Sequence, residues 1–130
     1  MPFDWIEYLR LARSLNGDDT DVCEIAGRQR AATSRAYYAA FCFARNYARD
    51  NYHFYPSYGP QDHENVRREY TNAADQLRGD DRERISNIAL QLNNLRQWRN
   101  RCDYQDDFAG LAIMTKMALR EATILIETLS

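Results

Sequence analysis

Apolar residues recur at steps of three and four along nearly the whole chain, and hardly any stretch alternates with the two-residue period of a half-buried strand. Steps of three and four place apolar side chains on one face of an α-helix. With 130 residues the chain has the length of one domain. We therefore expect a single domain over residues 1–130, folded as an all-α, up-and-down bundle of four longer helices with a short helix in front.

Residues that cap or break helices give the expected bounds of the first two helices. The first begins at Asp4, which can cap it with Glu7 three residues later, and stops before Gly17. The second starts near Thr20 or Asp21 and runs to about residue 50 without a proline. Its expected core face combines small residues, which permit close helix contact, with large aromatic ones. These residues are Ala32, Ala36, Tyr37, Tyr38, Ala39, Ala40, Phe41, Phe43, Ala44, Tyr47 and Ala48.

A loop interrupts the helices in the middle of the chain. The segment 51-NYHFYPSYGP-60 contains prolines and a glycine, and Pro60 suits the first turn of a following helix. That third helix is expected over about residues 60–78, ending at Gly79.

Acidic pairs mark the expected starts of the last two helices. Asp80 and Asp81 are expected to cap a fourth helix that runs to about Arg101, and the fifth is expected to start near Asp106 or Asp107 and to continue to the C-terminus. Its apolar face is formed by Leu111, Ala118, Ala122, Leu125 and Leu129.

Composition excludes several classes of protein. Hydrophobic residues make up 45% and charged residues 28% of the chain, which is typical of a globular domain and not of a disordered one. The longest apolar stretches, such as 36-AYYAAFCFA-44, are too short to cross a bilayer, and the N-terminal residues do not resemble a secretory signal. The three cysteines, Cys23, Cys42 and Cys102, fit neither a disulfide framework nor a zinc site. We expect a cytoplasmic protein with reduced thiols, no cofactor and no metal.

Arginine is the dominant basic residue. The net charge is −2, so the whole molecule does not attract nucleic acid strongly, but every basic residue except Lys116 is arginine. The segment 26–49 has no acidic residue and could form a basic face with Arg28, Arg30, Arg35, Arg45 and Arg49. Arginine grips phosphate bidentately and stacks on bases, which suits RNA or nucleotide contact. The alternative is that the arginine bias reflects codon usage, with nearby aspartates neutralising these side chains.

One arginine is expected to point toward the core. The apolar stripe of the fourth helix runs Ile85, Ile88, Leu92 and Leu95, and its next step is Arg99. An arginine keeps its charge in a protein, so a buried Arg99 needs a partner or a cleft. One interpretation pairs it with Asp103 one turn later, or with a tyrosine of the long helix. The other places it in a cleft where it meets a phosphate.

The segments 34-SRAYYAAFCFARNYARD-50, 63-HENV-66 and 95-LRQWRNRCDYQDD-107 together resemble the HEPN (higher eukaryotes and prokaryotes nucleotide-binding) domain. The resemblance implies a helical bundle, commonly a homodimer, found in toxin–antitoxin modules beside nucleotidyltransferase antitoxins and in other defence systems. Its catalytic members are metal-independent endoribonucleases with an Arg, a polar residue and, four to six residues after the Arg, a His. Arg99 and Asn100 match the first two positions.

The third position of that motif differs. Tyr104 stands where the family's histidine falls, and no histidine follows His63. Cleavage by the 2′-hydroxyl needs a group that accepts its proton, and a tyrosine with a pKa near 10 is ionised only to about one part in a thousand at pH 7. His53 or His63 could replace it if the fold brought either near Arg99.

Three functions follow as hypotheses. The first is a HEPN-like homodimer that binds RNA or a nucleotide-like phosphate without the family's cleavage. It places Arg99, Asn100 and Tyr104 at the catalytic position and assigns phosphate contacts to Arg35, Arg99 and Arg101. The second is a catalytically silent interaction module or adaptor that dimerises through the alanine-rich helix. The third is an active endoribonuclease that uses Tyr104 or a relocated histidine.

Overall fold

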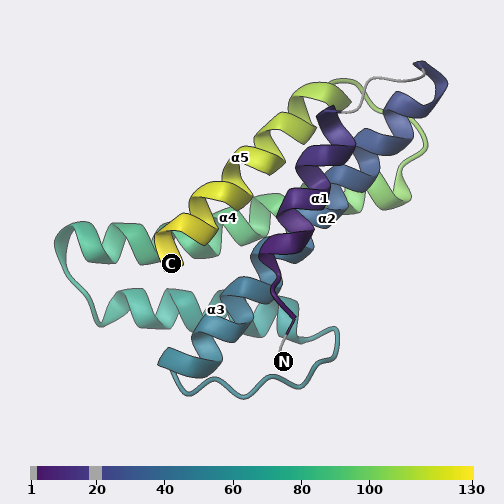
Figure 1. Cartoon of the computed structure of the whole chain (residues 1–130). Helices are drawn as coiled ribbons and strands as arrows, with labels where there is room; N and C mark the ends of the chain where they lie inside the picture. The colour runs from purple at the N-terminus through teal and green to yellow at the C-terminus, as the bar shows by residue number, and fades with distance from the viewer. Residues whose placement is uncertain (1–2, 18–21) are drawn as a thin grey trace.

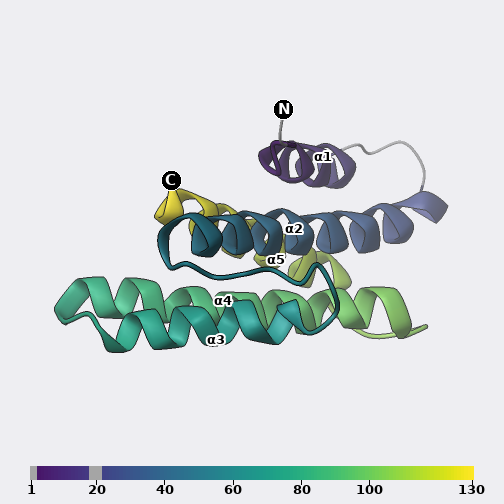
Figure 2. The ribbon, with the colours of Figure 1, turned by 90° about the horizontal axis from the view of Figure 1, so that it is seen from below.

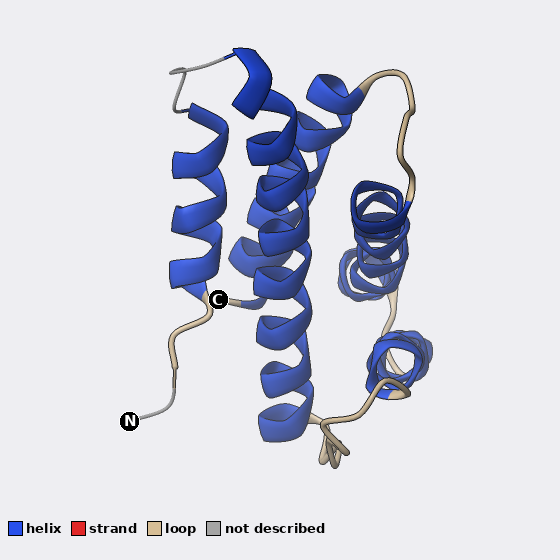
Figure 3. Cartoon of the chain, turned by 90° about the vertical axis from the view of Figure 1, so that its right-hand side faces the viewer, coloured by secondary structure: helices blue, strands red, loops and turns tan. Residues whose placement is uncertain are grey.

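Five α-helices make up most of the chain in the computed structural model, which describes residues 3–17 and 22–130 and, at 22–24, the backbone alone. Their bounds are Ile6–Gly17 for α1, Val22–Asn51 for α2, Asp62–Asp75 for α3, Gly79–Tyr104 for α4 and Leu111–Leu129 for α5. The described residues contain no strand (Figure 3). The predicted all-α helical bundle is therefore confirmed. Within the described ranges, no helix is both long and apolar enough to span a membrane.

The helices form two groups that cross each other. In Figure 1, α1, α2 and α5 run side by side, whereas the hairpin of α3 and α4 runs across them. Figure 2 shows α2 between α1 on one side and the α3–α4 hairpin on the other. One hydrophobic core draws buried side chains from all five helices. Because α2 packs against every other helix, its side chains decide most of the packing.

The alanine-rich face of α2 makes this central position feasible. Its six alanines are completely buried: Ala32, Ala36, Ala39, Ala40, Ala44 and Ala48. Small side chains let neighbouring helices approach closely, and Tyr37 and Phe41, also buried, fill the larger spaces between them. The alanines are thus covered within the chain. Contrary to the expectation of a dimer through this helix, that face is not available to a second copy.

The N-terminal helix follows the prediction closely. The backbone N–H of Ile6 donates to a carboxylate oxygen of Asp4 over 3.0 Å, so Asp4 caps α1 as expected. The helix ends at Gly17. Thr20 and Asp21, the expected start of the long helix, lie outside the described residues, and α2 is described from Val22.

The expected cap of α4 is wrong by two residues. Arg78 occupies the N-cap position, and Gly79, with φ +62°, opens the helix. Asp80 and Asp81 therefore lie inside the first turn. There their carboxylates lie near the positive end of the helix dipole, and neither side chain caps the helix by a hydrogen bond to a free backbone N–H. The third helix also ends earlier than predicted, at Asp75.

The expected start of α5 is also wrong. The fourth helix continues to Tyr104, and Asp106 and Asp107 lie in the following loop. Arg30 holds this loop from α2, because its Nη2 donates to the carbonyl oxygen of Asp106 over 2.7 Å. The fifth helix begins only after Gly110, whose left-handed backbone (φ +82°) turns the chain into it.

The loop between α2 and α3 is organised around one buried carboxylate. Asp62 is 2% exposed, and its two oxygens accept the backbone N–H of Ser57, the hydroxyl of Ser57 and the backbone N–H of Tyr58, over 3.1, 2.7 and 2.8 Å. These bonds fold residues 57–61 back onto the start of α3. The next residue, His63, is thereby fixed beside α2.

Candidate functional site

Arg99 is held by several partners near the C-terminal end of α4. Its Nη2 donates to the hydroxyl oxygen of Tyr38 over 2.7 Å and its Nη1 to the side-chain oxygen of Asn100 over 3.0 Å. Nε lies 2.9 Å from Oδ2 of Asp103, but it forms no hydrogen bond, so this contact is an ion pair. Both predicted structural partners, Asp103 and a tyrosine of the long helix, are thus confirmed.

Arg99 also lines a cavity, as the alternative interpretation expected. The cavity has a volume of about 660 Å³, within the range of roughly 300–1,000 Å³ that is usual for small-molecule sites. Its walls come from Trp5 just before α1, from α2, from the loop before α3, from the first turn of α3 and from the last turns of α4. They include Trp5, Tyr38, Phe41, Tyr58 and Tyr104 as aromatic surfaces. Arg99 therefore has both the structural partners of the first interpretation and the place on a cavity wall of the second.

Three guanidinium groups line this cavity, which we call the cation cavity: those of Arg45, Arg96 and Arg99. One carboxylate, that of Asp62, lies among the lining residues. Burial alone would raise the pKa of Asp62, but its hydrogen bonds from Ser57 and Tyr58, together with Arg45, outweigh this and lower it. Asp62 is thus ionised but already engaged in the loop. The lining residues carry an excess of positive charge.

Arg96 is the cation with the fewest protein partners. Its side chain is half-buried, and in the described part of the chain it forms no ion pair and no hydrogen bond. Its Nε is fully buried without a partner. A buried donor of a charged group without an acceptor is costly, commonly about 1–3 kcal/mol. An anionic ligand in the cavity would supply the missing opposite charge and acceptors for the terminal nitrogens of this guanidinium.

His63 lies in the same cavity. Its ring stacks on that of Phe41, with 4.4 Å between the centroids, and its Nδ1 forms a hydrogen bond with the hydroxyl of Tyr37. Burial, followed by the charges of Arg96 and Arg99, lowers the pKa of His63 below its ordinary value. The imidazole is therefore neutral at pH 7. Of the two histidines considered from the sequence, His63 is brought beside Arg99, whereas His53 is exposed and does not line the cavity.

The other predicted site residues take different positions. Tyr104 lines the cavity although its side chain is 73% exposed, and the guanidinium carbon of Arg99 lies 5.9 Å from the centre of its ring. Asn100 is not among the residues that line the cavity, and its side-chain oxygen accepts a hydrogen bond from Arg99. Arg35 and Arg101 are both exposed. The guanidinium of Arg35 lies over the ring of Tyr8, and that of Arg101 lies over the ring of Phe108. Of the three arginines assigned to phosphate contacts, only Arg99 thus lines the cavity.

The expected basic face of the long helix is divided among separate roles. Arg30 donates from Nη1 to the carbonyl oxygens of Cys102 and Gln105, each over 2.7 Å, and so secures the end of α4. Arg45 lines the cation cavity, and Arg49 pairs with its neighbour Asp50 over 2.9 Å. Arg30, Arg45 and Arg49 thus serve separate purposes: the end of α4, the cavity wall and a local ion pair.

The thiols of Cys42 and Cys102 are free and buried. Burial raises the pKa of Cys42 to about 11 and raises that of Cys102, so both are neutral at pH 7. Cys102 is a small apolar side chain in the core, whereas the side chain of Cys23 lies outside the described residues. Among the described residues, no group of three His, Cys, Asp or Glu side chains could hold a metal ion.

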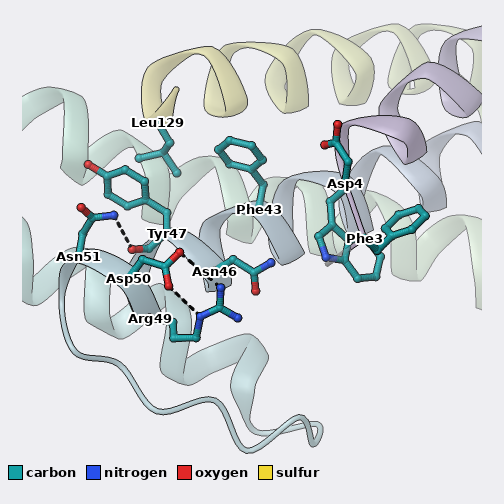
Figure 4. Close-up of a pocket in the computed structure, with 10 residues that line it drawn as sticks. Phe3, Asp4, Phe43, Asn46, Tyr47, Arg49, Asp50, Asn51 and Leu129 are labelled. Carbon is teal, nitrogen blue, oxygen red and sulfur yellow. Dashed lines mark hydrogen bonds and ion pairs between the residues drawn. The ribbon is translucent and has the colours of Figure 1, made fainter. Parts of the chain in front are cut away.

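A second cavity of about 270 Å³ lies where the C-terminal end of α2 approaches the N-terminal segment and Leu129 of α5 (Figure 4). Its walls contain Phe3, Phe43 and Tyr47, and its charged groups are Asp4, Arg49 and Asp50. In Figure 4, Arg49 and Asp50 are joined to each other at the edge of the cavity. Its arginine therefore already has a carboxylate partner, unlike Arg96.

Comparison with known proteins identifies no relative. No family model matches this chain, and no curated protein and no solved structure matches it. The resemblance to the HEPN family stays a prediction from the sequence, and the residues of the cation cavity carry the functional argument.

Three residues of this site were missed in the sequence: Tyr37 as a partner of His63, and Arg45 and Arg96 as lining cations. Arg96 lies three residues before Arg99 and so shares its side of α4, a spacing that could have indicated it. Tyr37 and Arg45 are brought to His63 by the fold of the loop at residues 52–61. No local pattern predicts that approach.

Proposed function

We infer that this chain is a HEPN-like domain that binds RNA through a phosphate held in the cation cavity. The observation that carries the proposal is Arg96, a guanidinium on the cavity wall that forms no ion pair and no hydrogen bond with any described residue. Guanidinium groups bind phosphate with charge-assisted, often bidentate hydrogen bonds. Arg45 and Arg99 add further positive charge to the same space.

The aromatic walls favour RNA over an isolated anion. Tyr38, Tyr58 and Trp5 line the cavity with the three arginines, and bases of single-stranded RNA stack on such side chains. The volume of about 660 Å³ leaves room for a phosphate with an adjoining nucleoside. Binding without cleavage is the function we propose, because Tyr104 occupies the place of the family's histidine.

The proposal is tested with a fluorescently labelled, short single-stranded RNA whose binding is followed by anisotropy at several salt concentrations. Arg96→Gln removes the unpartnered cation, and Arg101→Gln is a matched control: it makes the same charge change on the same helix, outside the cavity. We expect Arg96→Gln to weaken binding about tenfold. The slope of log K against log salt should become shallower by about 0.7, the value for one lost phosphate contact on a single strand.

The control determines how this result is interpreted. If Arg101→Gln weakened binding as much as Arg96→Gln, the RNA would be attracted by overall charge and not by the cavity. If neither substitution changed binding, or if the wild type bound no RNA, the proposed function would be wrong. Circular dichroism and thermal melting of both variants confirm that the fold is intact.

A second candidate function, a catalytically silent interaction module, is favoured by the outer face of α5. Ile113, Met117 and Ile124 are 67%, 44% and 37% exposed and share one side of that helix. Exposed apolar side chains in one place are typical of a contact surface. We place the proposed homodimer contact here. Met117→Glu should then convert the dimer to a monomer, which light scattering measures as a halved molar mass. A molar mass equal to that of the wild-type dimer would exclude this face.

The biological setting rests on the resemblance alone. We propose a cytoplasmic domain of a toxin–antitoxin or defence module, with a nucleotidyltransferase-type antitoxin as the partner protein. Co-expression with the neighbouring gene product and co-purification test this setting. Failure of a nucleotidyltransferase to bind, when one is encoded there, would contradict it.

A further inference from the structure

The hydroxyl of Tyr37 has one partner in the described chain, and this partner determines the tautomer of His63. Tyr37 is 1% exposed, and its hydroxyl forms a hydrogen bond with Nδ1 of His63 and with no other group in the described ranges. Burial raises the pKa of Tyr37 far above its ordinary value, so the phenol keeps its proton at pH 7. A buried O–H group therefore stands against one nitrogen of the imidazole.

The direction of this hydrogen bond follows from what the hydroxyl needs. If Nδ1 carried the imidazole proton, the phenolic proton of Tyr37 would have no acceptor, which costs about 1–3 kcal/mol for a buried donor. If Nδ1 is unprotonated, it accepts the phenolic proton and every group in the pair is satisfied. The second arrangement is therefore the stable one. In a neutral imidazole it places the remaining proton on Nε2.

The surroundings of the ring keep it in this neutral form. Arg96 and Arg99 approach it from α4, Tyr37 and Tyr38 approach from α2, and Asp62 precedes it in α3. The two cations oppose a further positive charge, and their effect and that of burial exceed the opposing effect of Asp62. Protonation of Nδ1 would also displace the hydrogen bond from Tyr37.

We propose that His63 is an RNA-binding residue that donates its Nε2–H to a phosphate oxygen in the cation cavity, and that Tyr37 is the positioning residue that fixes this tautomer. The inference rests on the proposed function and deepens it. Nε2 has no hydrogen-bond partner in the described chain, and His63 lines the cavity. The N–H of a neutral imidazole adds a directed donor beside the charges of Arg96 and Arg99.

This arrangement has a chemical consequence. In RNA cleavage the 2′-oxygen attacks phosphorus, its proton passes to a base, and the bond from phosphorus to the 5′-oxygen breaks as that oxygen takes up a proton. An imidazole with its proton on Nε2 has no lone pair there to accept the 2′-hydroxyl proton. His63 in this form binds a phosphate oxygen but does not act as the base.

Two substitutions that differ by one methylene group test the donor. His63→Gln places a side-chain amide near the position of Nε2, whereas His63→Asn places it near that of Nδ1. We expect His63→Gln to bind the labelled RNA within about threefold of the wild type, and His63→Asn to bind about tenfold more weakly. Equal affinities of the two folded variants would overturn the inference. RNA cut by the wild type but not by His63→Gln would also overturn it, because His63 would then transfer a proton.

Nitrogen-15 NMR of the histidine rings tests the tautomer independently of ligand. The chain has two histidines, so His53→Gln assigns the signals. We expect His63 in the Nε2–H form at pH 7, and a signal for the Nδ1–H form or the charged ring would overturn the inference. If Arg96→Gln weakens RNA binding but His63→Gln and His63→Asn bind RNA with equal affinity, only this inference fails. If the wild type binds no RNA, the proposed function and this inference fail together.

Discussion

The cation cavity and the second cavity are built from the same kinds of residue but differ in how their charges are paired. In the cation cavity, Arg96 has no carboxylate partner among the described residues, and the carboxylate of Asp62 on the wall is buried and engaged by the loop. In the second cavity, Arg49 and Asp50 are exposed and neutralise each other (Figure 4). The cation cavity thus has more arginines than carboxylates and an arginine without an ion pair, and can take an anion, whereas the one arginine of the second cavity is already paired.

The comparison also separates two kinds of carboxylate. Asp62 accepts three hydrogen bonds in a buried position and so shapes the wall of the cation cavity. Asp50 pairs with the adjacent residue in solvent, where such pairs contribute little to stability. Substitutions at the two positions should therefore have very different effects.

The largest expected effect is that of Asp62→Ala. It leaves the hydroxyl of Ser57 and two backbone N–H groups without an acceptor, and we expect the free energy of unfolding to fall by about 3 kcal/mol in urea titrations. RNA binding should fall as well, because Tyr58, Gly59 and Pro60 form part of the cavity wall.

Asp50→Ala is the control for Asp62→Ala. It removes a carboxylate from the other cavity and should leave both stability and RNA binding unchanged. If the two variants were equally stable, the loop would not depend on Asp62, and the contrast between the two carboxylates would be lost.

Arg99→Ala should have an intermediate effect. The substitution leaves the hydroxyl of Tyr38 and the carboxylate of Asp103 without their partner, and we expect a loss of about 2 kcal/mol in the free energy of unfolding. RNA binding should weaken in the same variant, because Arg99 both supports α4 and lines the cavity. Binding is measured at a temperature where the variant is fully folded.

Arg49→Ala provides the comparison, since its partner Asp50 is exposed. It should change neither the unfolding curve nor RNA affinity. A stable Arg99→Ala that still binds RNA with wild-type affinity would remove Arg99 from both roles.

The sequence predicted Arg99 because the apolar stripe of α4 is regular: after Ile85, Ile88, Leu92 and Leu95, all buried, the next step is this arginine. It predicted the ends of helices less well. Asp80 is a typical capping residue, but the left-handed backbone of Gly79 moves the start of α4 so that Asp80 falls inside the first turn. Local preference cannot distinguish a cap from a first turn when both favour an aspartate.

The chemistry of the cation cavity could not be predicted from local patterns. Tyr37 and His63 are 26 residues apart, and their contact depends on the loop that Asp62 holds. Arg96 lines the cavity, and the fold brings no hydrogen-bond or ion-pair partner from the described residues to its side chain. The identity and spacing of residues indicated a partner for Arg99, but the unpaired charge of Arg96 is a property of the three-dimensional arrangement.

The smallest expected effect is a difference in how stability depends on pH. Because the pKa of His63 is lowered in the folded state, the unfolded chain binds the proton more readily than the folded chain as the pH falls below about 6.5, the ordinary value. The wild type should therefore lose stability between pH 6.5 and about pH 5, where most carboxylates are still ionised. His63→Gln has no imidazole in the cavity to protonate, so its free energy of unfolding should fall less over the same interval.

Chemical denaturation at several pH values measures this difference, and His53→Gln is the matched control. That variant removes the exposed histidine outside both cavities, so its pH dependence should follow that of the wild type. Arg96→Gln provides a further comparison: it removes one of the two charges that oppose protonation of His63, so its loss of stability over the interval should be smaller than that of the wild type. If the stability of the wild type, His63→Gln and Arg96→Gln depended on pH in the same way, the unpaired charge of the cation cavity would not act on His63. The proposed electrostatic difference between the two cavities would then be wrong.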